Sequence, residues 1–438
     1  MYKKIMGLLI IILIIMVTLT IEKKDSIKEL EVTILKSENN YLTVQDQEQK
    51  IYNIPTIDED ILIGSNILLK YQGNLENMRV LSYITINNNT EDIPLEWLEN
   101  GIFKNYYVKA FTKLQELSLD DKINQLLLVR YPKDNGQSLL EDKQFGGYVF
   151  YERDFKNKNK EEVSNIMNNL QKVANIPILT AVDEEGGDVV RISSNKQLSE
   201  EKFKSPQVLY QEGGLELIKE DTLKKSQLLK ELGINLNLAP VVDISTNKSD
   251  YIYRRTLGLD ALYTKEYAKT VINASKNTGV SYTLKHFPGY GNNIDTHLSS
   301  SVDNRSYADL LSNDLEPFIE GINEGAEAVM ISHNIVNSID PENPASLSLK
   351  IHELLRNDLH FTGIIITDDL AMGATKNIKD NGYKAIKAGN DLLITTNYQE
   401  TFNSIKKALE NNDLTMAEIN QKVFKIIAWK YYKNLLTD

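Results

Sequence analysis

The sequence of 438 residues contains no cysteine. Disulfide bonds, thiolate metal sites, cysteine nucleophiles and lipid-modified cysteines are therefore all excluded. The sequence also lacks a Walker loop, a G-x-G-x-x-G fingerprint after a strand, a G-x-S-x-G elbow and an H-E-x-x-H metal motif. Any chemistry must therefore come from carboxylates, histidines and a few cations.

An excess of basic charge is also missing, because 61 acidic residues outnumber 49 basic ones and leave a formal net charge of −12. A surface that follows phosphates needs basic patches, so this balance argues against a nucleic-acid partner. Apolar residues make up 42% of the chain, which is enough for a sizeable hydrophobic core. The length indicates about two or three domains.

Histidine and arginine are scarce. All five histidines lie between residues 286 and 360, and the whole chain has only eight arginines. Where a composition avoids a residue type, the few positions that keep it are the first candidates for function.

Residues 1–25 combine a basic start with an apolar run from Ile5 to Ile21. This pattern is typical of a secretory signal, and 17 helical residues reach about 25 Å, near the short end of a membrane span. The run lacks small residues in an A-x-A-like cleavage arrangement. We expect an uncleaved signal-anchor that exports the chain and holds it on the membrane, with secretion after cleavage as the lesser alternative.

Residues 26–92 contain short β-branched segments separated by Asn, Asp, Gly and Glu clusters, as expected for strands joined by turns. This pattern predicts a small all-β module without a catalytic constellation, for which a spacer or packing role is favoured over ligand binding. The predicted strands are residues 30–36, 41–44, 61–63, 66–71 and 80–86.

Residues 100–438 alternate strand-like runs with amphipathic helical stretches, which implies an α/β fold with a parallel sheet. Eight strand candidates suit a (β/α)8 TIM-like barrel, and a doubly wound open sheet is the competing architecture. The first candidate is doubtful, because a capped helix start precedes it. The candidates are residues 125–129, 147–151, 177–182, 234–238, 280–284, 328–331, 363–367 and 391–394.

Charged or titratable side chains follow five of these strands, at the ends where active sites form in parallel α/β folds. Carboxylates, histidines and cations around a cleft suit a polyhydroxylated neutral substrate, and they also suit glycoside hydrolysis. The segments begin at Asp183, Ala239, Lys285, Ser332 and Asp368.

Asp368 is the best nucleophile candidate, because it directly follows a strand and would lie at the mouth of the barrel, whereas Asp369 fits an N-cap better. Asp295 and His297 are two residues apart, so an extended loop would place both side chains on one face. There the carboxylate can orient the imidazole, and the pair can act as general acid and then general base.

Several motifs resemble family 3 glycoside hydrolases, in the branch of the β-N-acetylglucosaminidases (β-N-acetylhexosaminidases). The resemblance covers about residues 105–430, with the motifs in the family's order. They are DEEGG (Asp183–Gly187) followed by Arg191, NLAPVVD (Asn237–Asp243), KHFPG (Lys285–Gly289), DTH (Asp295–His297) and TDDLAM (Thr367–Met372).

The resemblance implies retaining hydrolysis of terminal β-linked N-acetylhexosamine from cell-wall fragments or related glycans, with no metal and no organic cofactor. Asp368 would attack the anomeric carbon, while His297, oriented by Asp295, would protonate the leaving oxygen and then activate water. For His333 a buried supporting role is an equal alternative to sugar binding. The positions that match the family's sugar-binding residues are Asp183, Arg191, Arg255, Lys285, His286 and His333.

Two departures from the family affect the loop that carries the acid/base pair. Tyr290 stands where the family commonly has histidine, and the span from Gly291 to Asp295 is about one residue shorter than usual. A β-glucosidase or β-xylosidase of the same family, and a membrane-tethered glycan-binding protein without catalysis, are the alternative functions. The DTH loop favours the amino-sugar branch. The sequence carries no prediction of the oligomeric state.

Overall fold

The computed structural model describes residues 27–38, 41–48, 50–55, 66–75, 78–87, 100–296 and 299–437. These residues fall into two compact units, one within residues 1–98 and one within residues 99–438. The hydrophobic segment at residues 1–25 and the strand predicted at residues 61–63 lie outside the described residues. Within those ranges, no helix combines the length and the apolar character that crossing a membrane requires.

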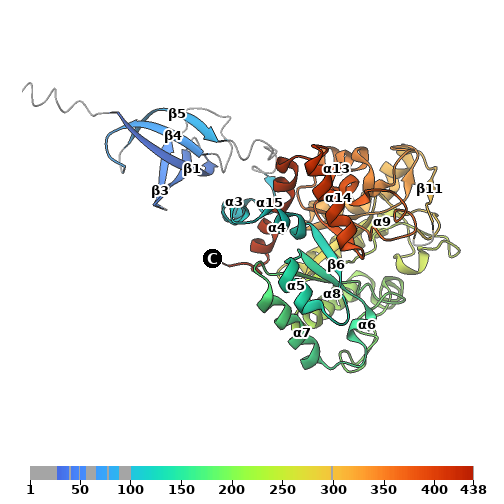
Figure 1. Ribbon diagram of the computed structural model, residues 1–438. Helices are drawn as coiled ribbons and strands as arrows, with labels where there is room; N and C mark the ends of the chain where they lie inside the picture. The colour runs from blue at the N-terminus through green and yellow to red at the C-terminus, as the bar shows by residue number, and fades with distance from the viewer. Residues whose placement is uncertain are drawn as a thin grey trace, which may run out of the picture. The chain divides into compact units, whose positions relative to one another are not determined.

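The first unit is an antiparallel sheet in the order β3-β2-β1-β4-β5 (Figure 1). Its strand β3 was not predicted, because Asn53 and Pro55 are unfavourable in strands; β3 is at one end of the strand order, where a proline is tolerated. The strands are β1 Lys28–Glu38, β2 Tyr41–Asp46, β3 Ile51–Pro55, β4 Asn66–Gln72 and β5 Arg79–Asn87.

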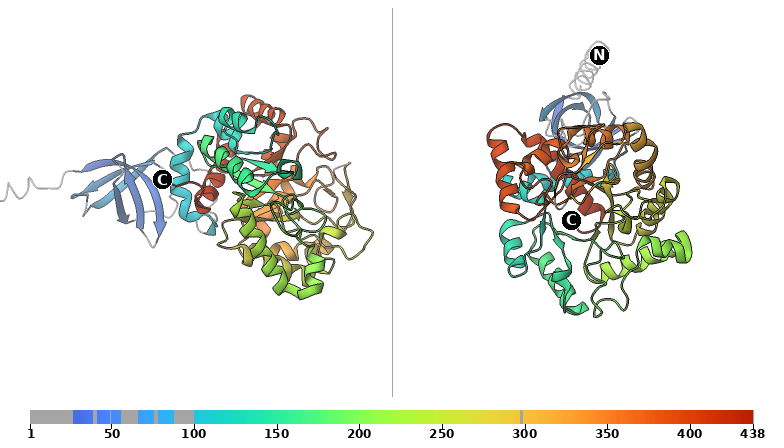
Figure 2. Two further views of the ribbon diagram at one scale, coloured as in Figure 1. Left: turned by 90° about the horizontal axis from the view of Figure 1, so that it is seen from below. Right: turned by 90° about the vertical axis from the view of Figure 1, so that its right-hand side faces the viewer.

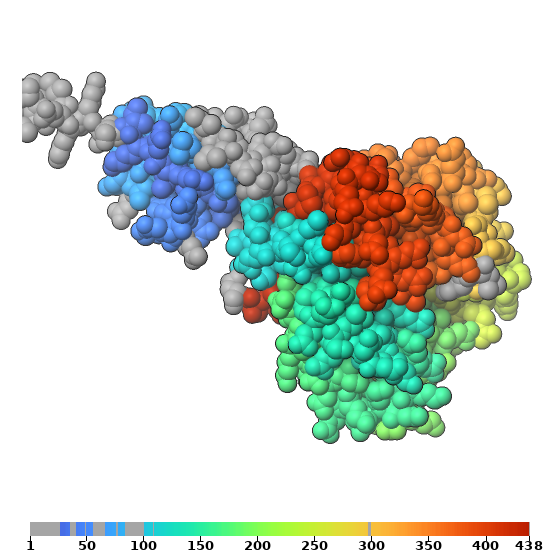
Figure 3. Space-filling model, in the orientation of Figure 1, coloured from blue at the N-terminus to red at the C-terminus, as the bar shows by residue number. Residues whose placement is uncertain are grey.

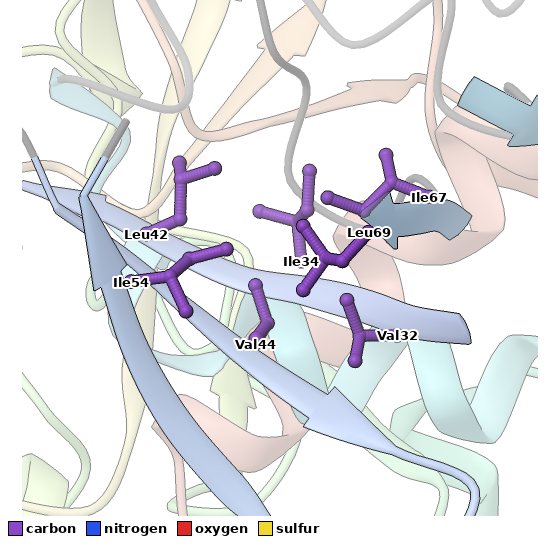
Figure 4. Packing of buried hydrophobic residues seen from close by; sticks show 7 residues of the cluster. All are labelled: Val32, Ile34, Leu42, Val44, Ile54, Ile67 and Leu69. Atoms are coloured by element: carbon purple, nitrogen blue, oxygen red, sulfur yellow. The ribbon is translucent and has the colours of Figure 1, made fainter. Parts of the chain in front are cut away.

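The core of this sheet follows the two-residue period of a β-strand. Alternate residues of β1, β2 and β4 are buried, and their side chains point toward one another on one face (Figure 4). The buried cluster is Val32, Ile34, Leu42, Val44, Ile54, Ile67 and Leu69.

The second unit contains eight parallel strands in the order β14-β12-β10-β9-β8-β7-β6-β15. The two ends of this row meet, because the Leu392 N–H donates to the carbonyl of Ile365 and the Thr367 N–H donates to the carbonyl of Leu392. The sheet therefore curls into a barrel, which confirms the predicted (β/α)8 fold against the open sheet. The strands are β6 Leu127–Arg130, β7 Gly147–Phe150, β8 Leu179–Val182, β9 Leu236–Asn237, β10 Ser281–Phe287, β12 Ala328–Ile331, β14 Ile364–Thr367 and β15 Leu393–Thr395.

The structure contains both the first barrel strand, which was doubtful from the sequence, and the capped helix that precedes it. Helix α4 (Leu119–Gln125) is capped by Ser118, whose side chain accepts a hydrogen bond from the Asp121 N–H. Strand β6 begins two residues after this helix ends. The other strands are buried on both faces, which explains their continuous apolar sequences.

Helices surround the ring of strands (Figure 2). The last helices contact the first ones, since α15 contacts α3 and α4, and α14 contacts α4; the red and cyan surfaces therefore adjoin in Figure 3. Two short strands, β11 (Val302–Asp303) and β13 (Ile335–Val336), pair with each other in the loops that follow β10 and β12. The helices are α3 Tyr107–Gln115, α4 Leu119–Gln125, α5 Gly136–Lys143, α6 Glu152–Phe155, α7 Lys160–Val173, α8 Pro206–Glu231, α9 Ala261–Ser275, α10 Tyr307–Asp309, α11 Glu316–Asn323, α12 Leu349–Glu353, α13 Asn381–Ala388, α14 Tyr398–Glu410 and α15 Met416–Tyr432.

Helix α12 carries a buried histidine that makes the stability of the barrel unit depend on pH. The His352 ring is almost fully buried, and its Nδ1 lies 2.7 Å from the carbonyl oxygen of Ser348, to which a neutral ring donates. Burial lowers the pKa of His352 to about 4.

Because this folded-state pKa is below the ordinary value, the unfolded chain binds the proton more tightly, and stability is lost as the pH falls from about 6.5 to about 4. Between pH 7 and pH 5 this loss is about 2 kcal/mol. We predict that His352→Leu removes this part of the pH dependence, measured as free energies of urea unfolding at the two pH values. The exposed His360, replaced by Asn, should leave it intact. Equal pH dependence in wild type and His352→Leu would contradict the prediction.

Candidate active site

A cavity of about 580 Å³ opens at the carboxyl ends of the barrel strands. This is the end at which barrel enzymes place their chemistry. A larger cavity of about 820 Å³ lies among residues before the strands, such as Pro177 and Ile234, and is not a candidate on that ground. Of the predicted site residues, the smaller cavity is lined by Asp183, Arg191, Arg255, Lys285, His286 and Asp368.

The centre of one wall is the buried ammonium group of Lys285 on β10. Its Nζ atom lies 2.8 Å from an oxygen of Asp183 and 2.6 Å from an oxygen of Glu185. Arg255 forms a two-pronged pair with Glu185, at 2.8 Å and 3.0 Å. Burial by itself would raise the pKa of Glu185, but Arg255 and Lys285 hold it well below its usual range. In these four residues, the Lys285 cluster, each charge therefore has an opposite partner that offsets the cost of its burial.

The segment after β8 is extended, so its successive side chains point to opposite sides. Asp183 and Glu185 point toward Lys285, whereas the buried carboxylate of Glu184 accepts hydrogen bonds from the backbone N–H groups of Arg191, Ile192 and Ser193. Glu184 thereby fixes the backbone at Arg191, whose guanidinium group lies 3.5 Å from Asp183.

His286 is oriented by Asp243, which follows β9. The Nδ1 atom of His286 lies 2.7 Å from one oxygen of Asp243, and the other oxygen accepts the backbone N–H of Tyr290 at 2.7 Å. The Nε2 atom of His286 lies 3.4 Å from the guanidinium group of Arg255. Asp243 therefore holds both the ring in the cavity wall and the start of the following loop.

The hydroxyl of Tyr290 fixes the loop that carries Asp295. It accepts the backbone N–H of Thr296 at 2.9 Å and lies 3.1 Å from the carbonyl oxygen of Ile294, so it holds both neighbours of Asp295. Burial raises the pKa of Tyr290 to about 12, so the hydroxyl keeps its proton. The tyrosine that departs from the family motif is thus the anchor of this loop. His297 lies outside the described residues.

A second tyrosine connects this loop to the cavity wall. Tyr251 lines the cavity, its ring lies 5.8 Å from that of Tyr290, and its hydroxyl is hydrogen-bonded to Asp295. Burial raises the pKa of Tyr251, and Asp295 raises it further against the opposing charge of Arg255.

Asp368 and Asp369 differ in their roles at the end of β14. The carboxylate of Asp369 accepts the N–H groups of Ala371 and Thr396 and the hydroxyl of Thr396, so it stabilises the turn. The Asp368 backbone N–H donates to the carbonyl of Ile331 on β12, and one oxygen of its carboxylate accepts the N–H of Asp369 at 2.8 Å. Asp368 lines the cavity. Burial raises the pKa of Asp369, and the charge of Asp368 adds to this.

A family model for the glycosyl hydrolase family 3 N terminal domain matches residues 118–428. The chain belongs to glycosyl hydrolase family 3. The predicted family and the prediction of a glycoside hydrolase are thereby confirmed.

Similar proteins come from several bacteria. The chain is 29% identical to a beta-hexosaminidase of Nitrosomonas eutropha, over 60% of this chain and 77% of the relative. It is 32% identical to a beta-hexosaminidase of Glaesserella parasuis, over 60% of this chain and 76% of the relative. Among solved structures, a glycoside hydrolase family 3 beta-N-acetylglucosaminidase from Paenibacillus sp. strain FPU-7 is 27% identical with a TM-score of 0.68; the match covers 74% of this chain and 64% of that one.

His333 does not line the cavity of this family 3 barrel. Its ring is fully buried, with Nδ1 2.7 Å from the hydroxyl of Ser346 and Nε2 3.0 Å from the carbonyl oxygen of Asp369. The structure therefore places His333 behind the turn that follows Asp368, in the supporting position that the sequence left open.

Several residues of the wall were not found from the sequence. Glu185 stands two residues after Asp183, and the period of two along an extended segment was the available signal. Arg130 ends β6, the strand that the capped helix made doubtful, and its guanidinium group lies 4.6 Å from the centroid of the Tyr151 ring.

No group of three or more acidic or histidine side chains suited to a metal ion is found in the part of the chain that the structure describes.

We predict that Tyr290→Phe loosens the backbone around Asp295, because it removes the acceptor of the Thr296 N–H. The exchange of that amide with solvent deuterium should become about three- to tenfold faster, as measured by mass spectrometry of peptides that cover residues 291–300. Tyr263→Phe removes an exposed tyrosine hydroxyl on α9, outside this loop, and it should leave this amide unchanged. Unchanged exchange in Tyr290→Phe would contradict the anchoring role.

Proposed function

We propose that the protein is a retaining exo-β-N-acetylglucosaminidase that removes terminal β-linked N-acetylhexosamine from cell-wall fragments or related glycans. The observation that carries this proposal is the cavity itself, in which the carboxylate of Asp368 and the Lys285 cluster line one space. The relatives named beta-hexosaminidase and beta-N-acetylglucosaminidase support the amino-sugar specificity.

The non-reducing sugar would be held by the Lys285 cluster together with Arg191 and His286. Ionised groups form stronger hydrogen bonds to hydroxyls than neutral groups do, and their fixed positions select the hydroxyl geometry of one sugar. Asp183 and Arg191 are partly exposed, so their outer atoms can reach a ligand, whereas the buried Lys285 holds Asp183 in place.

The proposed reaction has two steps. The Asp368 carboxylate forms a bond to the anomeric carbon while the glycosidic bond breaks, and His297 gives its proton to the leaving oxygen. His297 then takes a proton from water, whose oxygen attacks the anomeric carbon and releases Asp368. Asp295 would orient His297, and the anchored loop at Tyr290 and Thr296 would hold Asp295 in turn.

The location of the enzyme depends on residues 1–25. We propose that they hold the chain on the outer side of the membrane as a signal-anchor, where cell-wall glycans are accessible. The small sheet within residues 27–87 would then stand between the membrane segment and the barrel in the chain. Secretion after signal cleavage is the alternative.

Asp368→Asn should reduce the turnover of an aryl N-acetyl-β-glucosaminide by at least about a thousandfold, because an amide is a poor nucleophile. Circular dichroism and the thermal midpoint should show that the variant is folded. Asp188→Asn, which breaks an exposed pair with Arg254, should keep wild-type turnover. Near-normal turnover by a folded Asp368→Asn variant would remove Asp368 from the nucleophile role.

Substrate pairs with and without the 2-acetamido group distinguish the candidate functions. The full chain should hydrolyse 4-nitrophenyl N-acetyl-β-glucosaminide with a higher kcat/KM than the corresponding β-glucoside and β-xyloside. The opposite order would establish the glucosidase or xylosidase alternative. Binding of N-acetylglucosamine without hydrolysis of any substrate would establish a glycan-binding protein.

A further inference from the structure

Arg130 is a cation of the cavity that forms no ion pair with a carboxylate in the described part of the chain. It ends β6, its guanidinium group lies over the Tyr151 ring, and its Nε atom is buried without a hydrogen-bond partner. The described residues provide neither an ion pair nor a hydrogen bond for this guanidinium group. The charge of Arg130 acts on the nearby Asp154 carboxylate without a direct contact. One oxygen of Asp154 accepts the Tyr151 backbone N–H, and the other lies 3.3 Å from the Nε atom of Arg153.

The other cations of the cavity differ from Arg130 in their pairing. Lys285 and Arg255 share Glu185 at 2.6 Å and 2.8 Å. Arg191 is paired more weakly than Lys285 and Arg255, because its guanidinium group lies 3.5 Å from Asp183. Its Nε atom, like that of Arg130, is buried without a hydrogen-bond partner. Its guanidinium group lies 5.7 Å from the centroid of the same Tyr151 ring. Arg130, Tyr151 and Arg191 together form the arginine wall.

We infer that the arginine wall is a subsite for an anionic group, a carboxylate or a phosphate, on the bound sugar. A guanidinium group presents a rigid fork of N–H donors that matches both oxyanions, and such donors are costly to leave unpaired away from bulk water. Tyr151 holds Arg130 by stacking without using these donors. The inference rests on the proposed function in one respect, because that function identifies the ligand that carries the anionic group as a glycan.

The order of the strands indicates which sugar carries the anion. In the ring of eight, β6 lies opposite β10, and the loop that carries Asp295 follows β10. The leaving group is directed to that loop, so a group that meets Arg130 belongs to the non-reducing sugar over the barrel mouth.

A second explanation for the position of Arg130 is an effect on Asp368, and a separate measurement must distinguish it from anion binding. Only β15 stands between β6 and β14 in the ring, and the alternative is that Arg130 stabilises the ionised form of Asp368. In that case the loss of Arg130 would affect neutral and anionic substrates alike, and it would shift the acidic limb of the pH profile of kcat/KM.

The test compares three 4-nitrophenyl N-acetyl-β-glucosaminides: the neutral compound, its 6-phosphate and its 3-O-lactyl ether. Arg130→Gln should lower the ratio of anionic to neutral kcat/KM by about ten- to a hundredfold for one anionic compound, and that compound identifies the source of the anion. Arg130→Lys, which keeps the charge without the fork, should lose less. Arg254→Gln is the matched control, because Arg254 is an exposed arginine paired with Asp188, and it should leave the ratio unchanged.

An unchanged ratio in Arg130→Gln, or an equal loss for all three substrates with a shifted acidic limb, would overturn the subsite. If the wild type hydrolyses none of the three, the proposed function fails, but the subsite is still tested by calorimetry with N-acetylglucosamine, its 6-phosphate and N-acetylmuramic acid. One of the two anionic sugars should then bind more tightly than N-acetylglucosamine, and only in protein that retains Arg130. Equal binding of all three by wild type would overturn the subsite as well.

Discussion

The ammonium group of Lys285, buried between Asp183 and Glu185, is the interaction on which the site depends. A lone charge at this depth would be too costly to keep, so the folded state requires the carboxylates that follow β8 to meet the lysine of β10. Arg255 joins the same pair from the loop after β9, which brings strand β10 and the loops after β8 and β9 into one network. The wall that would receive a sugar is therefore formed before any ligand arrives, and the charges of the Lys285 cluster are already balanced.

Much of the fold could be predicted because the barrel strands are short apolar runs that end in charged residues. The same rule brought Asp183, Lys285 and Asp368 together, since the carboxyl ends of parallel strands share one edge. The rule did not identify Arg130, because a capped helix start directly precedes β6 and made that strand doubtful in the sequence. Some side chains act by holding the backbone of another residue, as Glu184 does when it accepts the N–H of Arg191. Such a contact leaves no recognisable pattern in a single sequence.

Tyr290 shows how a departure from a family motif can be accommodated. The tyrosine hydroxyl meets the backbone on both sides of Asp295, and its own backbone is held by Asp243, which also orients His286. The loop and the cavity wall are therefore connected through one buried carboxylate, that of Asp243. The backbone on both sides of Asp295 is therefore fixed by a single hydroxyl.

The central claim is that Asp368 forms a covalent bond to the sugar, and trapping that intermediate tests it most directly. The enzyme would be incubated with a 5-fluoro N-acetylglucosaminyl fluoride, which slows the second step more than the first, and then digested for peptide mass mapping. The account predicts a mass increase of one fluorinated sugar on the peptide that contains Asp368, and none in Asp368→Asn. A stable adduct on any other residue would contradict it.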